Sequence, residues 1–364
     1  MKIVIAAWHL KDSNVGIGRY CRGLISALGH VDKENEYHVL MPEYIGQLPR
    51  FNNVRYHVIR LPFFKRRVWE QVAPQLVGRY DILHFPYDSS VVLKRGKFVI
   101  TIHDVKPLIF GALRPRRGLR DCVERLLIPD RQKQADHVLT VSECSRRDII
   151  ERLCFPGERI SVVYPGIDHD QFKPGGTAPF RANSRPHILC VAGSDPTKNV
   201  ETLLDAFAQL PRELRETHDM VLVGDLRRRQ DVRDRVGKLG ILTQTKFVNV
   251  VSDAQLVSLY QYARAFVFPS RYEGFGFPVL EAMACGCPVI TSDVSSLPEV
   301  VGDAALLADP SDANGFAKHL EQVLVDEGLQ RRLREKGIIR AAQFSWERTA
   351  QETLRVYERI VMEA

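Results

Sequence analysis

The segment PSRYEGFGFPVLEAMACGCPVI, residues 269–290, decides the fold. It follows an apolar run, passes through a loop that contains Gly274 and Gly276, and continues as a helical pattern into a second apolar run. Pro278 suits the first turn of a helix, and the glycines let the backbone approach a ligand closely. A strand, a loop, a helix and a second strand in this order predict a parallel sheet.

The same alternation of short β-branched runs and helical patterns extends over the rest of the chain. In the first half, the predicted strands are residues 2–7, 37–41, 54–59, 82–85, 98–102, 137–141 and 160–163. In the second half, they are residues 187–192, 220–224, 246–250, 265–269, 288–291 and 304–308. The predicted helices include residues 18–28, 119–134, 143–153, 329–342 and 346–362. We therefore expect two doubly wound parallel sheets.

A stretch rich in Pro and Gly, residues 164–186, separates the two series and is typical of an interdomain linker. We expect residues 1–172 to form an N-terminal Rossmann-like domain that binds an acceptor and residues 173–345 a C-terminal one that binds a donor. The helix at residues 346–362 is expected to pack back on the first domain. Because ligands of such sheets bind at the carboxyl ends of the strands, we expect the active site in a cleft that the two domains face.

Positive charge is concentrated in the first half of the chain. Residues 1–174 contain 28 Lys and Arg against 19 Asp and Glu, a net charge of +9, whereas the whole chain carries +7. The basic clusters are Lys65, Arg66 and Arg67, beside Phe63, Phe64 and Trp69, which look exposed, and Arg114, Arg116, Arg117 and Arg120. Each alone is most simply a solvated face, but together they favour an anionic membrane surface or an anionic acceptor. They lack the regular aromatic platform of single-strand binders, so no nucleic acid is expected.

The cysteines and the N-terminus indicate a cytoplasmic protein. The chain has seven cysteines, an odd number, and no charged leader precedes an apolar core. Cys285 and Cys287 are interpreted as small buried residues, because no second Cys or His cluster has zinc-ligand spacing. The Asp168-His-Asp170 sequence follows Pro165-Gly166 and is interpreted as a turn. We therefore expect no metal site.

The loop before Pro278 has the features of a diphosphate site. Backbone amides and a helix N-terminus attract an anion, with about 0.3–1 kcal/mol from the helix end alone. Glu273 precedes the glycines, and Glu281 is expected in the first turn of the helix. Both carboxylates would repel a diphosphate unless they bind hydroxyl groups, and a carboxylate is suited to accept hydrogen bonds from the hydroxyls of a sugar.

Glu273 and Glu281, eight positions apart, resemble the Glu-x7-Glu motif of the retaining glycosyltransferases of family 4, which have the GT-B fold. The resemblance covers nearly the whole chain, and the order of its motifs makes it specific. Its other parts are Gly16-Ile-Gly18-Arg-Tyr, Ile102-His-Asp104, Tyr164-Pro-Gly-Ile-Asp, Lys198-Asn199, Ser295-Ser-Leu-Pro-Glu299 and Phe344-Ser-Trp-Glu-Arg.

The resemblance implies a role for each site residue. Glu281 would bind the ribose of a nucleotide-sugar donor, and Lys198 would stabilise the leaving diphosphate. Glu273 and His103 would lie nearest the reacting carbon of the transferred sugar. The remaining donor contacts would come from Gly16, Gly18, Gly274, Phe275, Gly276, Val279 and Leu280.

A second cation that the resemblance leads us to expect near Lys198 is missing from the sequence. The family often pairs the Lys with an Arg, but residues 193–197 contain none. Arg227, Arg228 and Arg229 follow a predicted strand and are alternatives between which the sequence does not decide.

The activity implied by the resemblance is a retaining, metal-independent transfer that needs no cofactor. The motifs resemble a branch rich in mannosyltransferases, which implies transfer of a hexose, mannose from GDP-mannose, to a lipid-linked or oligosaccharide acceptor in surface polysaccharide or lipopolysaccharide synthesis. GDP-rhamnose, UDP-glucose and UDP-GlcNAc are alternative donors. A sugar nucleotide epimerase of the same fold is a further alternative, and a nicotinamide enzyme is poorly supported because Cys21 replaces the third glycine of the Gly16-x-Gly18 pattern. The basic half suggests peripheral contact with the cytoplasmic face of an anionic inner membrane.

Overall fold

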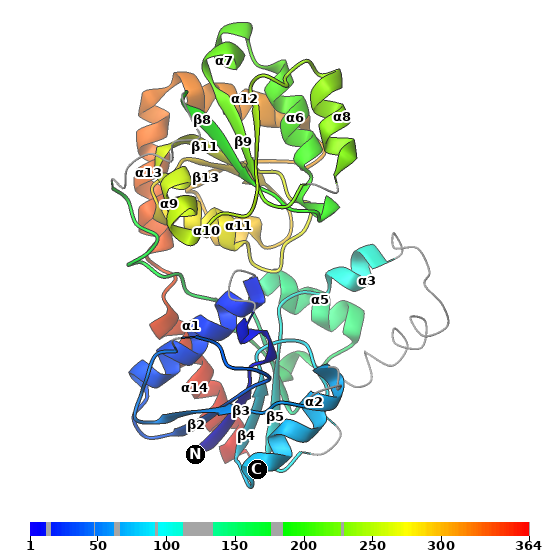
Figure 1. Cartoon of the computed structure of the whole chain (residues 1–364), viewed down its shortest axis with the longest axis vertical. Helices are drawn as coiled ribbons and strands as arrows, with labels where there is room; N and C mark the ends of the chain where they lie inside the picture. The colour runs from blue at the N-terminus through cyan, green and yellow to red at the C-terminus, as the bar shows by residue number, and fades with distance from the viewer. Residues whose placement is uncertain are drawn as a thin grey trace. The chain divides into compact units, whose positions relative to one another are not determined.

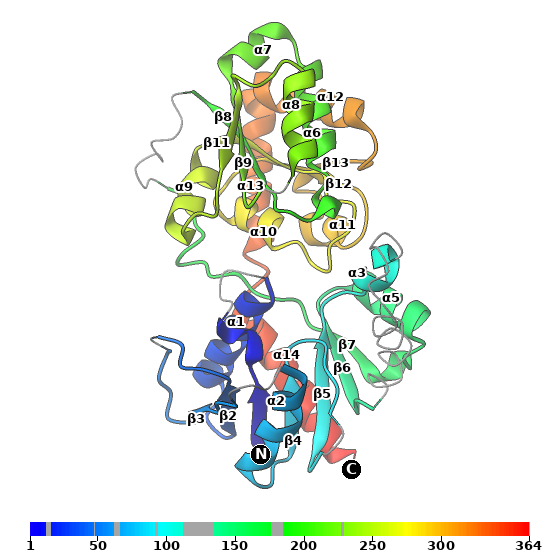
Figure 2. The same ribbon diagram turned by 45° about the vertical axis from the view of Figure 1, so that its right-hand side comes forward.

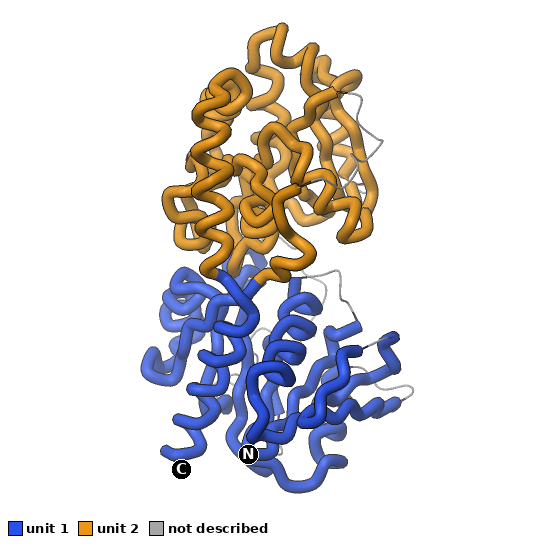
Figure 3. The backbone as a smooth tube through the Cα atoms, turned by 90° about the vertical axis from the view of Figure 1, so that its left-hand side faces the viewer, with its two compact units in different colours: residues 1–166, 344–364 blue, residues 167–343 orange. Residues whose placement is uncertain are grey.

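The computed structural model describes residues 1–11, 16–46, 48–61, 66–91, 94–111, 134–175, 185–226 and 229–363. They form two compact units, drawn in blue and orange in Figure 3. Unit 1 contains Met1–Gly166 and Phe344–Ala364, and unit 2 contains Ile167–Gln343. The chain therefore leaves unit 1, forms unit 2 and returns to unit 1 for its last helix.

Unit 1 is built on a seven-stranded parallel sheet with the order β3-β2-β1-β4-β5-β6-β7. Its strands are β1 (Lys2–Ala6), β2 (Glu36–Met41), β3 (Val54–Val58), β4 (Ile82–Phe85), β5 (Lys97–Ile102), β6 (His137–Thr140) and β7 (Ile160–Val162). The central strand β4 is buried at every residue, as expected for a parallel strand covered on both faces. Each strand predicted in the first half of the sequence is present.

The described helices of unit 1 lie in the connections between these strands, except for the last one, which follows unit 2 (Figure 1). They are η1 (Trp8–Lys11), α1 (Gly16–Val31), α2 (Arg66–Val72), η2 (Ala73–Val77), α3 (Lys106–Phe110), α5 (Glu143–Leu153), η4 (Gly157–Arg159) and α14 (Trp346–Met362). The Ser142 side chain accepts a hydrogen bond from the backbone N–H of Ser145 at 3.0 Å, which confirms the predicted N-cap of α5. Most of the helix predicted at residues 119–134 lies outside the described residues.

The last helix α14 packs along α1 (Figure 2). Gly23 of α1 permits the close approach, because a Cβ there would lie 2.2 Å from a ring carbon of Trp346. Deeper in the core, the Tyr357 hydroxyl lies 2.5 Å from Nδ1 of His84 in β4. The Nε2 atom of His84 lies 2.9 Å from the hydroxyl of Thr101 in β5. The helix α14 therefore supplies both apolar and polar contacts to the core of unit 1.

Unit 2 is built on a six-stranded parallel sheet with the order β10-β9-β8-β11-β12-β13. Its strands are β8 (His187–Val191), β9 (Asp219–Val223), β10 (Thr245–Val248), β11 (Ala263–Phe268), β12 (Val289–Ser292) and β13 (Ala305–Ala308). Its helices are η5 (Pro196–Lys198), α6 (Val200–Gln209), α7 (Arg212–Thr217), α8 (Gln230–Lys238), α9 (Asp253–Tyr262), α10 (Phe277–Ala284), α11 (Leu297–Val301), α12 (Ala313–Val325) and α13 (Glu327–Ala341). The prediction of two doubly wound parallel sheets is confirmed.

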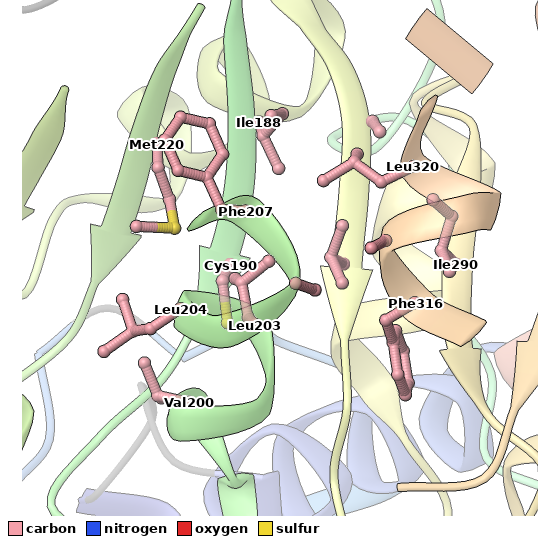
Figure 4. Close-up of a cluster of buried hydrophobic side chains, with 14 of the residues drawn as sticks. Ile188, Cys190, Val200, Leu203, Leu204, Phe207, Met220, Ile290, Phe316 and Leu320 are labelled. Atoms are coloured by element: carbon pink, nitrogen blue, oxygen red, sulfur yellow. The ribbon is translucent and has the colours of Figure 1, made fainter. Parts of the chain in front are cut away.

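An aliphatic and aromatic cluster fills the space between one face of this sheet and the helices α6 and α12 (Figure 4). Ile188 and Cys190 alternate along β8 toward this face, and Phe207 and Phe316 pack from the two helices. These four side chains are fully buried. Burial of a side chain such as Phe207 contributes about 1.5–3 kcal/mol to stability, so this cluster anchors unit 2.

The chain order reverses at one point in each sheet, which is called the switch point. In unit 1 it lies between β1 and β4, and in unit 2 between β8 and β11. Ligands of doubly wound sheets bind outside the carboxyl ends of the strands at this point. The two switch points therefore mark where functional side chains are expected. Among the described residues, no helix is both long enough and apolar enough to cross a bilayer.

Candidate active site

The loop between β11 and α10 is shaped by Gly276. Its φ angle is +109°, and a Cβ there would lie 2.9 Å from the Leu297 side chain. Only glycine adopts this conformation at little cost, and α10 begins at the next residue. Pro278 lies in the first turn of α10, as predicted. The hydroxyl of Ser296 lies 2.9 Å from the carbonyl oxygen of Glu273 and 2.8 Å from that of Phe275, which holds the loop in place.

Glu273 lies in this loop and pairs with Lys198. The Lys198 ammonium donates to Oε1 of Glu273 at 2.7 Å, and the Ser270 hydroxyl donates to the same oxygen at 2.6 Å. The side chains of Lys198 and Glu273 are 22% and 12% exposed. The backbone N–H of Glu273 donates to the hydroxyl of Ser295 at 3.1 Å. Two residues far apart in the sequence are therefore brought together at the switch point of unit 2.

Lys198 is held by its neighbours in the connection after β8. Asp195 caps η5 by accepting from the backbone N–H of Thr197 at 3.0 Å. Asn199 has a φ angle of +55° and is fully buried. Its side-chain amide donates to the carbonyl oxygen of Pro269 at 2.9 Å and to that of Pro310 at 2.7 Å. These bonds tie the Lys198 connection to the Glu273 loop.

Glu281 is a buried carboxylate on α10. It is 3% exposed, and Oε2 accepts a hydrogen bond from the Tyr260 hydroxyl at 3.1 Å. The expectation that it lies in the first turn of the helix is wrong, because α10 begins at Phe277 and has no acidic residue in its first turn. One turn deeper, the carboxylate faces α9 rather than the helix N-terminus.

Val279 and Leu280 are packing residues in this structure. Both side chains are fully buried, and both backbone N–H groups donate to the carbonyl oxygen of Gly276, at 3.1 and 3.4 Å. Gly274 and Phe275 are buried beside them. Donor contacts from these residues remain a prediction.

Of the three arginines considered as a second cation, only Arg229 lies within the described residues. It is 6% exposed, and its guanidinium pairs with Asp231 at 2.8 Å and also with Glu201. The hydrogen bond to Asp231 contributes most to raising the pKa of the Arg229 guanidinium. Two carboxylates already offset its charge, so Arg229 is poorly suited to bind a phosphate as well. Arg227 and Arg228 lie outside the described residues.

His103 follows β5 in unit 1. Its Nε2 atom lies 3.1 Å from the carbonyl oxygen of Pro86, and its ring packs edge-on against Tyr20 at 4.7 Å. Burial lowers the pKa of the imidazole, which is neutral at pH 7. Because a carbonyl only accepts, Nε2 carries the proton and Nδ1 is left as an acceptor. Gly16 is exposed at the start of α1, and Gly18 is buried within that helix.

A second polar group at the switch point of unit 1 was missed in the sequence. It consists of His9, Arg66, Glu70, Tyr87 and Ser89, and we call it the Arg66 cluster. Nη1 of Arg66 lies 3.0 Å from Nε2 of His9, and Nε lies 3.2 Å from Oε1 of Glu70. Two features of the sequence could have indicated this group. Polar residues follow the strands β1 and β4, and an Arg and a Glu lie four positions apart on one helix.

The expectation of an exposed aromatic residue at Trp69 is wrong. Trp69 is 1% exposed, and its indole N–H donates to the carbonyl oxygen of Ile59 at 2.8 Å. The basic residues Arg66 and Arg67 are the first two residues of α2, but only Arg66 belongs to the Arg66 cluster. Lys65, Phe63, Phe64 and the arginines at 114, 116, 117 and 120 lie outside the described residues.

Two further interpretations of the sequence can be compared with the structure. The Asp168 side chain accepts hydrogen bonds from the backbone N–H groups of Asp170 and Gln171, at 3.0 and 3.1 Å, which confirms a turn. Cys285 and Cys287 are buried free thiols, as predicted. Over the described part of the chain, no three His, Cys, Asp or Glu residues are placed to share a metal ion.

Comparison with known proteins gives consistent matches over both units. Residues 15–171 match the profile of the family described as Glycosyltransferase Family 4, and residues 178–340 match that of Glycosyl transferases group 1. The chain is 31% identical to O-antigen chain mannosyltransferase B of Escherichia coli, over 98% of this chain and 100% of that protein.

Two solved structures show the same fold. Sucrose-phosphate synthase of Thermosynechococcus elongatus has a TM-score of 0.79 at 22% identity, with 100% of both chains covered. Anabaena HepE in complex with UDP-glucose has a TM-score of 0.72 at 18% identity, with 99% of this chain and 100% of that chain covered. The prediction of a GT-B fold is confirmed.

Proposed function

Because the chain belongs to glycosyltransferase family 4, we propose that it transfers mannose from GDP-mannose to a lipid-linked or oligosaccharide acceptor, with retention at the anomeric carbon. The process would be assembly of a surface polysaccharide such as lipopolysaccharide. The name of the Escherichia coli relative supports both the sugar and the type of acceptor. Membership of a transferase family disfavours the epimerase alternative.

The observation that carries the proposal is the Lys198–Glu273 pair at the switch point of unit 2. A 2.7 Å pair of opposite charges next to the Gly274–Gly276 loop is matched to a ligand with an anionic part and a hydroxylated part. The diphosphate of the donor binds the Lys198 ammonium, and the sugar hydroxyls donate hydrogen bonds to the Glu273 carboxylate. Donor binding therefore exchanges one internal ion pair for two charge-assisted contacts.

The other residues complete the proposed roles. Glu281 binds the ribose hydroxyls, and the amides of the loop at residues 274–276 bind the diphosphate near the N-terminus of α10. Lys198 stabilises the charge that develops on the leaving group. Neutral His103 offers Nδ1 to a sugar hydroxyl. No carboxylate is assigned as a covalent nucleophile, since the leaving phosphate can take the proton of the acceptor.

A second candidate is the same reaction with another donor. UDP-glucose is the ligand in the HepE structure, so UDP-glucose, UDP-GlcNAc and GDP-rhamnose belong in any test. A thermal-shift panel of these donors measures which one binds the folded chain, because a ligand that binds only the folded state raises Tm according to its saturation. We expect GDP-mannose to raise Tm most. A larger shift with a UDP-sugar would reject the proposed donor.

Retention and metal independence are tested in a transfer assay with GDP-mannose and an α-linked mannotriose acceptor. We expect an α-mannosidic product by NMR, because the donor is α-linked, and an unchanged rate in EDTA. A β-linked product would reject retention. A loss of activity in EDTA that Mn²⁺ restores would reject metal independence.

We also propose a cytoplasmic location with peripheral membrane contact through unit 1. The six described cysteines are free thiols, which fits a reducing compartment. The net charge of +9 over residues 1–174 supports contact with anionic lipid.

A further inference from the structure

The Arg66 cluster occupies the position in unit 1 where a doubly wound sheet binds its ligand. His9 follows β1, and Tyr87 and Ser89 follow β4, so these residues flank the switch point. Glu70 and Arg66 reach it from α2. None of its members is among the residues that we assign to the donor, so the proposed donor roles do not account for it.

The cluster contains a buried carboxylate whose charge is offset by one guanidinium. Glu70 is 2% exposed, and its Oε1 atom lies 3.2 Å from Nε of Arg66. Burial raises the pKa of the Glu70 carboxyl, and Arg66 opposes this shift. The Arg66 side chain is 38% exposed and also contacts the Tyr87 ring, with 5.5 Å between the guanidinium and the ring centroid. Arg66 therefore joins the buried carboxylate to the surface.

Three buried polar atoms of the cluster lack a hydrogen bond among the described residues. They are Oε1 of Glu70, the hydroxyl oxygen of Tyr87 and Oγ of Ser89. Weak hydrogen bonds from both hydroxyls lower the pKa of the Glu70 carboxyl, but they are too long or too poorly aligned to satisfy these three atoms. Native proteins rarely leave such atoms without a partner, so three in one place indicate a missing ligand or water. One acceptor and two hydroxyls complement the hydroxyl groups of a polyol.

Aromatic residues lie on the same segments as these polar atoms. His9 packs edge-on against Tyr87 at 4.8 Å, and Trp8 packs edge-on against Trp69 at 5.3 Å. Trp8 is half-buried, and its partner is fully buried. A few polar groups among aromatic side chains are typical of small-molecule sites, and the C–H face of a pyranose is apolar enough to lie on such rings.

We propose that the Arg66 cluster binds a neutral pyranose of the acceptor. Arg66 donates to its hydroxyls, and Oε1 of Glu70 accepts from one hydroxyl while the carboxylate also pairs with the guanidinium. A neutral sugar fits better than a phosphate, because Glu70 already offsets the charge of Arg66 and would repel a second anion. This inference rests on the proposed transferase function and specifies which residues select the acceptor.

The test uses the full chain with α-mannotriose as the neutral probe and pyrophosphate as the anionic probe. The variants are Glu70→Gln, Arg66→Gln and Arg66→Lys, with Arg67→Gln as the matched control, because Arg67 is an exposed neighbour on the same helix. We expect KM for α-mannotriose to rise about 10-fold or more in Glu70→Gln and Arg66→Gln, since each loses a hydrogen bond to a charged group. Donor affinity and kcat at saturating acceptor should stay close to wild type, and Arg66→Lys should restore part of the loss.

Ligand-observed NMR of α-mannotriose gives a second measurement that does not depend on transfer. We expect contact with the wild-type chain and with Arg67→Gln, and weaker contact with Glu70→Gln. If Glu70→Gln fails to fold, Tyr87→Phe and Ser89→Ala remove only the hydroxyl groups and should raise KM by a smaller factor. Pyrophosphate that binds through Arg66 while α-mannotriose does not would overturn the proposal.

Failure of this inference differs from failure of the proposed function. A wild-type chain that transfers sugar, with the same acceptor KM in all variants, would reject the acceptor site alone. A wild-type chain that binds α-mannotriose through Arg66 but uses no nucleotide sugar would reject the transferase and keep the site.

Discussion

Both units place a basic side chain against a carboxylate at the switch point of a parallel sheet, but the two pairs are held differently. In unit 2, Oε1 of Glu273 accepts from both Lys198 and Ser270, so the carboxylate is hydrogen-bonded before any ligand arrives. In unit 1, Oε1 of Glu70 lies 3.2 Å from Nε of Arg66 but has no hydrogen bond within the described part of the chain. Under the proposed roles, unit 2 is preorganised for the nucleotide-sugar donor, whereas unit 1 completes its hydrogen bonding with the acceptor sugar.

The sheets beneath the two sites also differ. The face of the unit 2 sheet toward α6 and α12 is packed by apolar side chains. The unit 1 sheet instead carries a buried polar line, in which His84 lies between Tyr357 of α14 and Thr101 of β5. Unit 1 is therefore expected to respond to pH through its core.

We expect the largest effect when the Lys198–Glu273 pair of unit 2 is broken. Replacement of Lys198 by Ala should lower kcat by about 10²- to 10³-fold, the usual loss when one group that stabilises developing negative charge is removed. The measurement is steady-state transfer from GDP-mannose, with Arg271→Ala as a control because Arg271 is an exposed residue of the neighbouring loop. Equal losses in both variants would mean that general electrostatics, and not the position of Lys198, controls the rate.

A smaller effect is expected at Glu281. Glu281→Ala should weaken donor binding roughly 10- to 150-fold, because a hydrogen bond to a charged group contributes about 1.5–3 kcal/mol. Calorimetric titration with the donor measures this loss. Tyr260→Phe is the matched control, since it removes only the hydroxyl that donates to Glu281. Unchanged affinity in Glu281→Ala would remove the ribose contact from the proposal.

The smallest effect concerns the pH dependence of stability, which we expect to be stronger in unit 1 than in unit 2. Burial lowers the pKa of His84 from 6.5 to about 3, so between these values only the unfolded chain binds a proton at this residue. Stability is thus present above pH 6.5 and is lost as the pH falls, by about 1.4 kcal/mol or tenfold in the unfolding equilibrium for each pH unit.

Hydrogen exchange measured between pH 6.5 and 5 can test whether unit 1 loses stability as the pH falls. Amides of β4 and α14 should lose protection faster than those of α6 and β12, which contain no histidine. The variant His84→Gln, which does not titrate, should weaken the dependence in unit 1, and the remainder comes from other buried imidazoles such as His137. A steeper loss in unit 2 than in unit 1 would contradict the expectation.

The strands and the donor loop could be predicted from the sequence because their information is local. Alternating apolar runs give the strands, and the segment from Glu273 to Glu281 lies within one loop and one helix. The depth of Glu281 was misjudged, because α10 begins at Phe277, directly after the αL residue Gly276, and Glu281 therefore lies beyond the first turn. A shift of this kind depends on the φ angle of one residue, which the sequence pattern does not contain.

The Arg66 cluster could not be assembled in the same way. Its members come from three separate segments, after β1, in α2 and after β4, and only the strand order brings them together. In the sequence, Arg66 belongs to a basic run and Trp69 looks exposed, whereas the fold buries Trp69 and Glu70 on the inner face of α2.

The return of α14 to unit 1 has a consequence for how the protein is made. The ribosome releases β1 to β7 first, but Gly23 and His84 meet Trp346 and Tyr357 only when the last helix has emerged. Unit 2, which is a continuous segment, has all of its strands available earlier. The half of the enzyme that is synthesised first thus finishes its core last, and a ribosome that stops short of α14 leaves a nascent chain with an incomplete first half.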